Sequence, residues 1–241
     1  MDKYNFNFSQ SDASQDVVTV SKSFISNVFS YMGLGLTLSA IVAYVFGTDM
    51  SYMRLLVSET GMTPLGYIVM FAPIAFVFAM SLGFQRMSST VMLLLFLVYS
   101  VVMGMSLSFI FMVYTHGSIF QTFGIAALTF GVMAVMGYTT KTDLTKFGSI
   151  LIMALIGIII ASLVNMFLHS SGMEYIISFI GVLIFTGLTA YDVQKLKRIG
   201  SGVDMGSEDA TKLAVFGALT LYLDFINLFL YLLRFFGNRR N

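Results

Sequence analysis

The sequence predicts an all-α membrane protein with seven transmembrane helices, and two observations carry this prediction. The first is composition: of the 241 residues, 57% are hydrophobic and 10% are charged, and the mean hydropathy is +0.87. A soluble domain carries about 25% charged residues. The second is the recurrence of long uncharged segments, because about 20 apolar residues form a helix that crosses a bilayer core about 30 Å thick. Helices are expected rather than open strands, since lipid offers no hydrogen-bond partners to the backbone.

Charged and polar residues divide the chain into the seven spans. The longest uncharged segment is divided in two at the polar stretch YTHGS, residues 114–118. The sixth span is short and is expected to end on Asp192, and the seventh is interrupted by a single charge, Asp224. Apart from that charge, the uncharged segments are residues 23–48, 60–85, 87–140, 147–173, 175–191 and 213–233.

The spans form one transmembrane domain, residues 23–237, between two tails. Residues 1–22 are polar, rich in Ser, Asn and Gln, and lack the apolar core of a signal sequence, so we expect a mobile cytoplasmic N-terminal tail. Residues 238–241 form a short C-terminal tail. The chain has no cysteine, which excludes disulfides and thiol catalysis, and its two histidines offer little for a metal site. A net charge of +1 gives no reason to expect a nucleic-acid partner.

The distribution of Lys and Arg predicts the orientation, because these residues gather on cytoplasmic loops. With the N-terminus inside, nine of them lie on the inner side and four on the outer side. The inner set is Lys3, Lys22, Arg86, Lys141, Lys146, Lys195, Lys197, Arg198 and Lys212. The outer set is Arg54, Arg234, Arg239 and Arg240. We therefore expect a multi-pass protein of the plasma or bacterial inner membrane with a cytoplasmic N-terminus and the C-terminus outside. The alternative is a re-entrant last helix, which would return the C-terminal tail to the inner side.

Asp224 is the most informative single residue, because it lies deep in an apolar span. It is 12 residues beyond Lys212, or about 18 Å of helix. An aspartate at a helix centre costs about 2.5 to 3.5 kcal/mol on insertion scales, so it normally faces a partner or water. Asp192 and Arg86 end the sixth and second spans on the same inner side. A structural alternative stays open, in which Asp224 is protonated and bonded to hydroxyl groups of a neighbouring helix.

The last two spans resemble the transmembrane Bax inhibitor motif family, the Bax inhibitor and its bacterial relatives. The resemblance rests on LTLYLDFINLFLYLLRFFG in the last span and on LTAYDVQKLK at the end of the sixth. It implies six helices around the C-terminal seventh and a pH-sensitive calcium-leak channel in which two aspartates share a proton. Matched motif by motif, these aspartates are Asp192 and Asp224, and the arginine that closes the second helix is Arg86 in GFQRMSS.

Physical chemistry gives such a pair a definite behaviour. Two carboxylates within hydrogen-bonding reach in a poorly solvated site cannot both ionise cheaply, so the pair binds a proton and senses pH. Its ionised form can hold Arg86 as a latch, and its protonated form cannot. The pair also offers oxygen ligands that suit Ca²⁺, although two carboxylates make a transient site for a permeant ion.

Two further residues are second-tier candidates. Pro73 removes a backbone N–H from the second helix, which predicts a kink that is either a hinge or ordinary packing. Asn227 lies one turn beyond Asp224 on the same face, where it could bond the carboxylate or contact an ion.

Other functional classes fit the sequence less well. An intramembrane aspartyl protease of the presenilin type also places YD and a second aspartate on consecutive helices. It needs a flexible Gly-x-Gly-Asp, whereas Leu221, Tyr222 and Leu223 precede Asp224, and a later Pro-Ala-Leu, whereas both prolines precede the two aspartates. A seven-helix retinal protein needs a lysine within the last span, and none of the uncharged segments contains one.

The sequence therefore predicts a monomeric, pH-sensitive, passive calcium or cation leak channel without catalytic turnover or a bound cofactor. Its expected partners are the lipid bilayer, calcium ions and protons. The alternative is a non-transporting membrane regulator, because relatives of the family are associated with restraining cell death or modulating a membrane protease through protein contacts. In that case a membrane protease or another membrane protein would be the partner.

Overall fold

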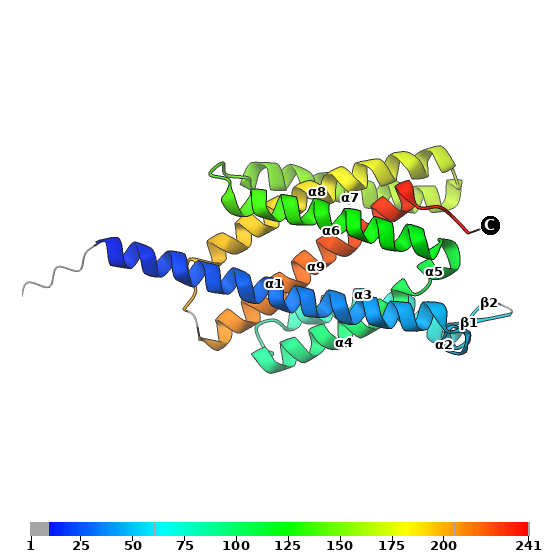
Figure 1. Cartoon of the computed structure of the whole chain (residues 1–241), viewed down its shortest axis with the longest axis horizontal. Coiled ribbons are helices and arrows are strands. Elements are labelled where there is room, and N and C mark those ends of the chain that lie inside the picture. The colour runs from blue at the N-terminus through cyan, green and yellow to red at the C-terminus, as the bar shows by residue number, and fades with distance from the viewer. Residues whose placement is uncertain (1–9, 60, 205, 241) are drawn as a thin grey trace, which may run out of the picture.

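The computed structural model describes residues 10–59, 61–204 and 206–240, with side chains from residue 20 onward. It is a helical bundle with one small two-stranded hairpin (Figure 1). The elements are α1 (Gln10–Thr48), α2 (Met50–Leu56), β1 (Val57–Ser58), β2 (Gly61–Met62), α3 (Pro64–Gly83), α4 (Ser89–Leu107), α5 (Ile110–Val113), α6 (His116–Thr139), α7 (Thr145–Leu168), α8 (Ser171–Gly200) and α9 (Glu208–Phe236).

The prediction of seven spans in an all-α membrane protein is confirmed. Within the described ranges, seven helices are long and apolar enough to cross a bilayer. They are Val20–Thr48, Pro64–Gly83, Ser89–Val113, His116–Thr139, Thr145–Leu168, Ser171–Gly200 and Glu208–Phe236. Residues 10–22, which were expected to belong to the N-terminal tail, are part of α1, and residues 1–9 lie outside the described part of the chain.

Hydroxyl side chains fix where many of these helices begin. In each case the side-chain oxygen of the residue before the helix accepts a hydrogen bond from a backbone N–H of the first turn, which would otherwise have no partner. Pro64, the first residue of α3, has no N–H to satisfy and its fixed φ suits this position. The capping residues are Thr63, Ser88, Thr115, Ser170 and Ser207.

The expectation that the sixth span ends on Asp192 is wrong, because α8 continues to Gly200. The charges beyond Asp192 therefore do not end the helix. Polar side chains of this extension hold the loop between α6 and α7. Gln194 accepts from the N–H of Leu144 at 2.8 Å and donates to the carbonyl of Thr142 at 2.8 Å. Lys197 donates to the carbonyl of Tyr138 at 2.8 Å.

The C-terminal helix α9 is the centre of the bundle. Its most apolar 18-residue window is 67% buried, against 17% for the corresponding window of α7. It packs against α1, α4, α6 and α8, while α3 packs mainly on α4 and α7 on α8. The expected arrangement of six helices around the seventh is therefore present as an inner ring of four helices with α3 and α7 outside it (Figure 1).

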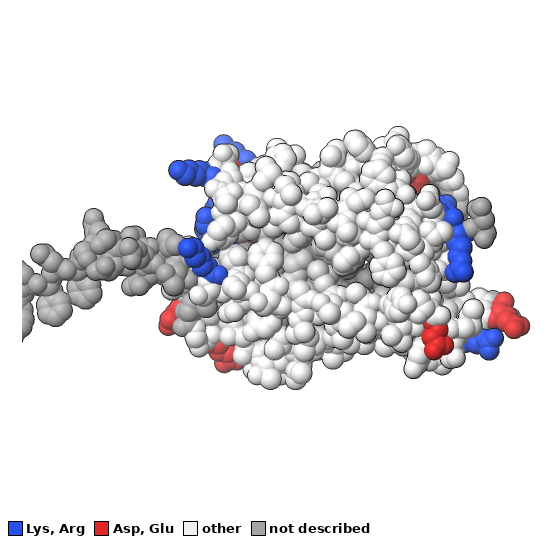
Figure 2. Space-filling model, viewed as in Figure 1, with Lys and Arg blue, Asp and Glu red and all other residues white. Residues whose placement is uncertain are grey.

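The surface has the pattern of a membrane protein. Figure 2 shows a belt without charged side chains between two ends that carry the Lys, Arg, Asp and Glu side chains. The exposed side chains midway along the spans are apolar, for example Leu128 on α6, which is 73% exposed, so we call this surface the apolar belt. The described start of α1 and the C-terminus lie at opposite ends of the bundle (Figure 1), so α9 crosses the belt fully and does not turn back.

Two glycines let neighbouring helices approach α8 just where it carries Asp192. A Cβ on Gly137 of α6 would lie 2.2 Å from the carbonyl oxygen of Ala190. A Cβ on Gly148 of α7 would lie 2.4 Å from the ring of Tyr191. The residues before Asp192 are thus clamped between α6 and α7, which fixes the position of the carboxyl group.

We predict that Gly137→Ala destabilises the bundle by about 1–3 kcal/mol, because the obstacle is backbone that cannot rotate away. Gly131→Ala on the same helix is the matched control, since nothing lies within 4 Å of a Cβ there and alanine favours helix. Thermal unfolding in detergent measures both. Equal midpoints for the two variants would contradict the close approach of α6 and α8.

The orientation predicted from the positive charges has a direct test, because the chain has no native cysteine. Glu59 in the β-hairpin and Lys141 after α6 are both exposed. A membrane-impermeant maleimide added to intact cells should label Glu59→Cys and should label Lys141→Cys only after permeabilisation. The reverse pattern would place the N-terminus outside.

Candidate functional site

The two sequence-predicted aspartates meet at the interface of α8 and α9. Asp192 is 8% exposed and Asp224 is 5% exposed. Their carboxyl groups lie in hydrogen-bonding contact. Two carboxylates this close in a buried site repel each other, whereas a carboxylic acid can donate to a carboxylate. The arrangement is therefore suited to hold one proton between two acids.

The deeper carboxyl group has an incomplete set of partners. Among the described residues, Oδ2 of Asp224 is buried without a hydrogen-bond partner. Buried polar atoms are normally satisfied, so an unsatisfied one in a native structure calls for an explanation. The structural alternative required hydroxyl groups of a neighbouring helix, and no hydroxyl in the described part of the chain donates to Oδ2 of Asp224. A proton held by the aspartate pair would supply the missing partner.

A cavity leads toward this pair from the end of the bundle that the positive charges predict to be the inner one. We call it the inner cavity; its volume is about 600 Å³, and Asp192 and Lys195 are its charged wall residues. On α9 its wall includes Gly217 and Thr220. Asp224 lies one turn beyond Thr220 on the same helix face. The inner cavity is lined by Ser81, Leu82, Phe84, Gln85, Asp192, Lys195, Leu196, Ile199, Leu213, Phe216, Gly217 and Thr220.

Beyond the pair, the same face of α9 is closed by packed apolar side chains. Leu228, one turn outward from Asp224, is fully buried. The ring of Tyr231, a further turn outward, stacks on Phe185 of α8 with centroids 5.7 Å apart. We call Phe185, Leu228 and Tyr231 the outer barrier. The aspartate pair thus has the inner cavity on one side and the packed side chains of the outer barrier on the other.

The predicted latch residue does not contact the pair. Arg86 is exposed after the end of α3, next to Gln85, which lines the inner cavity. Within the described ranges no carboxylate lies within 4.0 Å of its guanidinium group. The cation that acts on Asp192 is Lys195, one turn further along α8. In the sequence, Lys195 contributed only to the predicted orientation. Only the fold shows that it lines the inner cavity.

The two second-tier residues, Asn227 and Pro73, lie away from the inner cavity. Asn227 donates through Nδ2 to the carbonyl of Leu223 at 2.8 Å, so it bonds its own helix and not Asp224. Pro73 is buried inside α3, which is continuous from Pro64 to Gly83. Neither residue lines the inner cavity.

A hydrogen-bonded cluster on the opposite face of α9 was missed from the sequence. The hydroxyls of Tyr222 and Ser39 lie 2.6 Å apart, and the Ser39 hydroxyl is 2.7 Å from the carbonyl of Ser100. The cluster joins α9, α1 and α4 in the buried centre of the bundle. Its members are common residue types in membrane helices, so only the fold brings them together.

A second missed feature is an ion-pair cluster at the end of the bundle that holds the end of α9. Glu174, in the first turn of α8, accepts from Arg239 at 2.9 Å and lies 3.9 Å from Nε of Arg234. The C-terminal tail is also tied by backbone bonds, from Thr115 N–H to the carbonyl of Asn238 at 3.1 Å among them. These charges are partly exposed, so each pair contributes little stability, but together they hold the end of α9 on α8.

Asp143, in the loop between α6 and α7, provides a contrast with the buried pair. Its carboxylate accepts from the hydroxyl of Thr145 at 2.6 Å, from the Thr145 N–H at 3.0 Å and from Arg198 at 3.0 Å. These bonds, that of the Thr145 hydroxyl foremost, lower the pKa of Asp143 to about 2. It stays ionised at physiological pH and is not a candidate sensor.

The site offers two carboxyl groups to a cation. In the part of the chain that the structure describes, no group of three or more His, Cys, Asp or Glu side chains is arranged to bind a metal. Ca²⁺ takes six to eight oxygen ligands in a tight site. A pair of carboxyl groups at the end of an open cavity therefore suits an ion in passage better than a resident one.

Comparisons with known proteins give the family. Residues 21–241 match the family model described as inhibitor of apoptosis-promoting Bax1. An uncharacterized protein of Borreliella burgdorferi is 48% identical over 93% of this chain and 95% of its own length. The inner membrane protein YbhL of Escherichia coli K12 is 46% identical over 91% of this chain and 93% of its own. An uncharacterized membrane protein of Streptococcus pyogenes is 38% identical over 89% and 92%. The chain therefore belongs to the Bax inhibitor family of multi-pass membrane proteins.

Proposed function

We propose that this protein is a passive, pH-sensitive leak channel for calcium or a similar cation, with Asp192 and Asp224 as its proton sensor. The observation that carries the proposal is the unsatisfied buried carboxyl oxygen of Asp224 beside Asp192, and Asp192 lines the inner cavity. A buried acid pair binds and releases protons as one unit. Its negative charge would also attract a cation from the inner side.

The proposed mechanism begins with the proton. When the pair holds one proton, the two carboxyl groups can remain in contact, as they are in this structure. Loss of the proton leaves two negative charges in a poorly hydrated site, and these repel each other and attract a cation. Arg86 lies beside the mouth of the inner cavity, so in this state it can be drawn in as a latch. At acidic pH the pair would be protonated and lose its negative charge, so Arg86 would be released.

Passage of an ion needs a second movement. The outer barrier closes the α8–α9 interface beyond Asp224, and its packed rings would have to separate. Gly181 on α8 gives this interface little clearance, because a Cβ there would lie 2.5 Å from the Tyr231 ring. A change in the charge of the aspartate pair acts on the same interface and is therefore well placed to shift the outer barrier.

We predict that Asp224→Asn flattens the pH dependence of Ca²⁺ flux into proteoliposomes, because the amide fills the same space and cannot ionise. Asp209→Asn is the matched control on the same helix, since Asp209 is an exposed acid paired with Lys212 at 3.0 Å, and it should keep the wild-type profile. Helicity by circular dichroism verifies that each variant is folded. Wild-type protein without flux at any pH would favour the regulator alternative.

A double-mutant cycle tests whether the two aspartates act together. Asp192→Asn should alter the same pH response as Asp224→Asn, and the double variant should do no more than the stronger single one, since coupled groups titrate as a unit. Ca²⁺ flux is measured as a function of pH for the wild type, the two single variants and the double variant. Additive effects would show two independent sites.

The latch predicts an effect of defined sign. If the ionised pair holds Arg86 in the closed state, Arg86→Ala removes an attraction of about 1 kcal/mol and raises the leak at neutral or alkaline pH about fivefold. Lowering the pH should then raise the leak of this variant only a little further. Lys141→Ala, which removes another inner cation, is the control. An Arg86→Ala profile like that of wild type would remove the latch and leave the aspartate sensor in place.

A further inference from the structure

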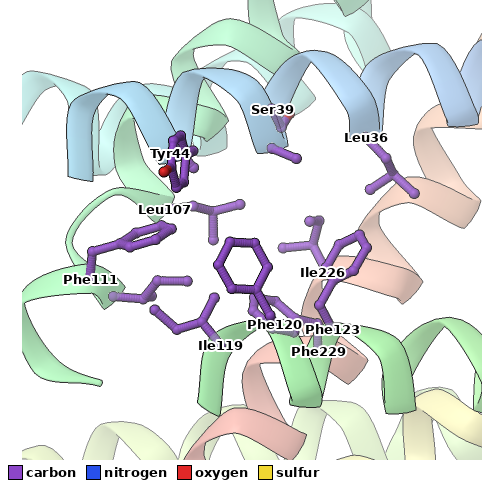
Figure 3. Close-up of a pocket in the computed structure, with 13 residues that line it drawn as sticks. Leu36, Ser39, Tyr44, Leu107, Phe111, Ile119, Phe120, Phe123, Ile226 and Phe229 are labelled. Carbon is purple, nitrogen blue, oxygen red and sulfur yellow. The ribbon is translucent and has the colours of Figure 1, made fainter. Parts of the chain in front are cut away.

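A second cavity opens on the side of the bundle between α1 and α6. We call it the lateral groove; its volume is about 180 Å³. Both flanking helices pack on α9, whose Ile226 and Phe229 form part of the groove lining, as Figure 3 shows. The groove is lined by Leu36, Ser39, Ala40, Ala43, Tyr44, Leu107, Ile110, Phe111, Ile119, Phe120, Phe123, Ile226 and Phe229.

The lateral groove is continuous with the surface that faces lipid. Residues on its rim are exposed within the apolar belt: Tyr44 of α1 is 49% exposed and Phe120 of α6 is 59% exposed. The neighbouring Ile41, outside the groove, is 57% exposed. Figure 2 views this face and shows charged side chains at the two ends of the belt only. The medium that meets the groove is therefore the hydrocarbon of the bilayer.

The lining selects hydrocarbon over water. A buried water needs two to four polar partners, and an apolar cavity of about 150 Å³ stays dry and takes up benzene. The Ser39 hydroxyl, on the groove wall, is already bonded to Tyr222 and Ser100. At the deep end, Ile226 and Phe229 are each 3% exposed, so an occupant there would complete the packing around α9.

We propose that the lateral groove is a binding site for an acyl chain of a membrane phospholipid. The chain enters sideways between α1 and α6 and packs on Ile226 and Phe229. These residues lie on the same side of α9 as Tyr222 and on the opposite side from Asp224, by the 3.6-residue period of the helix. The bound chain thus supports the back of the helix that carries the deeper aspartate.

Photo-crosslinking in a bilayer tests this site. Purified protein is reconstituted in phosphatidylcholine vesicles doped with phosphatidylcholine that carries a diazirine midway along one acyl chain, and adducts are mapped by mass spectrometry. We expect adducts on Ile226 or Phe229, which ordinary annular lipid does not reach. Ile156, midway along α7 and 54% exposed, is the internal standard. Labelled Ile156 with an unlabelled groove floor would overturn the proposal.

A matched pair of variants separates the groove from general lipid contact. Ala40→Trp fills the mouth of the groove and should lower the adduct yield on Ile226 and Phe229 severalfold. Ile41→Trp adds the same side chain to the adjacent lipid-facing position and should leave that yield unchanged. Equal yields in both variants would contradict binding in the groove. The wild-type labelling pattern decides the question even if Ala40→Trp does not insert.

Discussion

The contact between the carboxyl groups of Asp192 and Asp224 is the constraint around which the bundle is organised. Two acids deep in a membrane protein are costly, and each must be placed within hydrogen-bonding reach of the other. The placement of α8 depends on Gly137 and Gly148, where the neighbouring helices come too close for any side chain. The placement of α9 depends on its burial among four helices. Close packing at small residues thus determines the positions of the two carboxyl groups.

The central helix α9 is held differently on its two sides. Toward α8 it presents Asp224 and two residues of the outer barrier, Leu228 and Tyr231. Toward α1 and α4 it presents Tyr222, whose hydroxyl lies 2.6 Å from that of Ser39, and beside this bond lies the apolar lateral groove. A hydrogen bond in a site without water is hard to break, so the α1 side is suited to serve as the fixed support. The α8 side holds the group that changes charge.

The sequence predicts the spans and the aspartate pair well, because charges within long apolar runs are rare and costly. It predicts helix ends poorly, since the polar residues after Asp192 could be either a loop or a helix beyond the membrane. Asn227 shows the limit for single residues: its helix spacing suits Asp224, but the carbonyl of Leu223 on its own helix is the partner it bonds. Glu174 and the arginines it pairs with meet only because the fold brings the start of α8 beside the end of α9 and the tail that follows it.

In the proposed channel, the asymmetry of the α8–α9 interface would connect the aspartate pair to the outer barrier. The inner cavity reaches Asp192, while Leu228 and Tyr231 close the next two turns outward. Both the acids and the barrier side chains lie across the same pair of helices, so no separate coupling element is required between them. Asp224 lies one turn from Leu228 on α9, at the edge of the outer barrier. In the proposed channel, a change in the protonation of the pair would therefore act next to the side chains that close the α8–α9 interface.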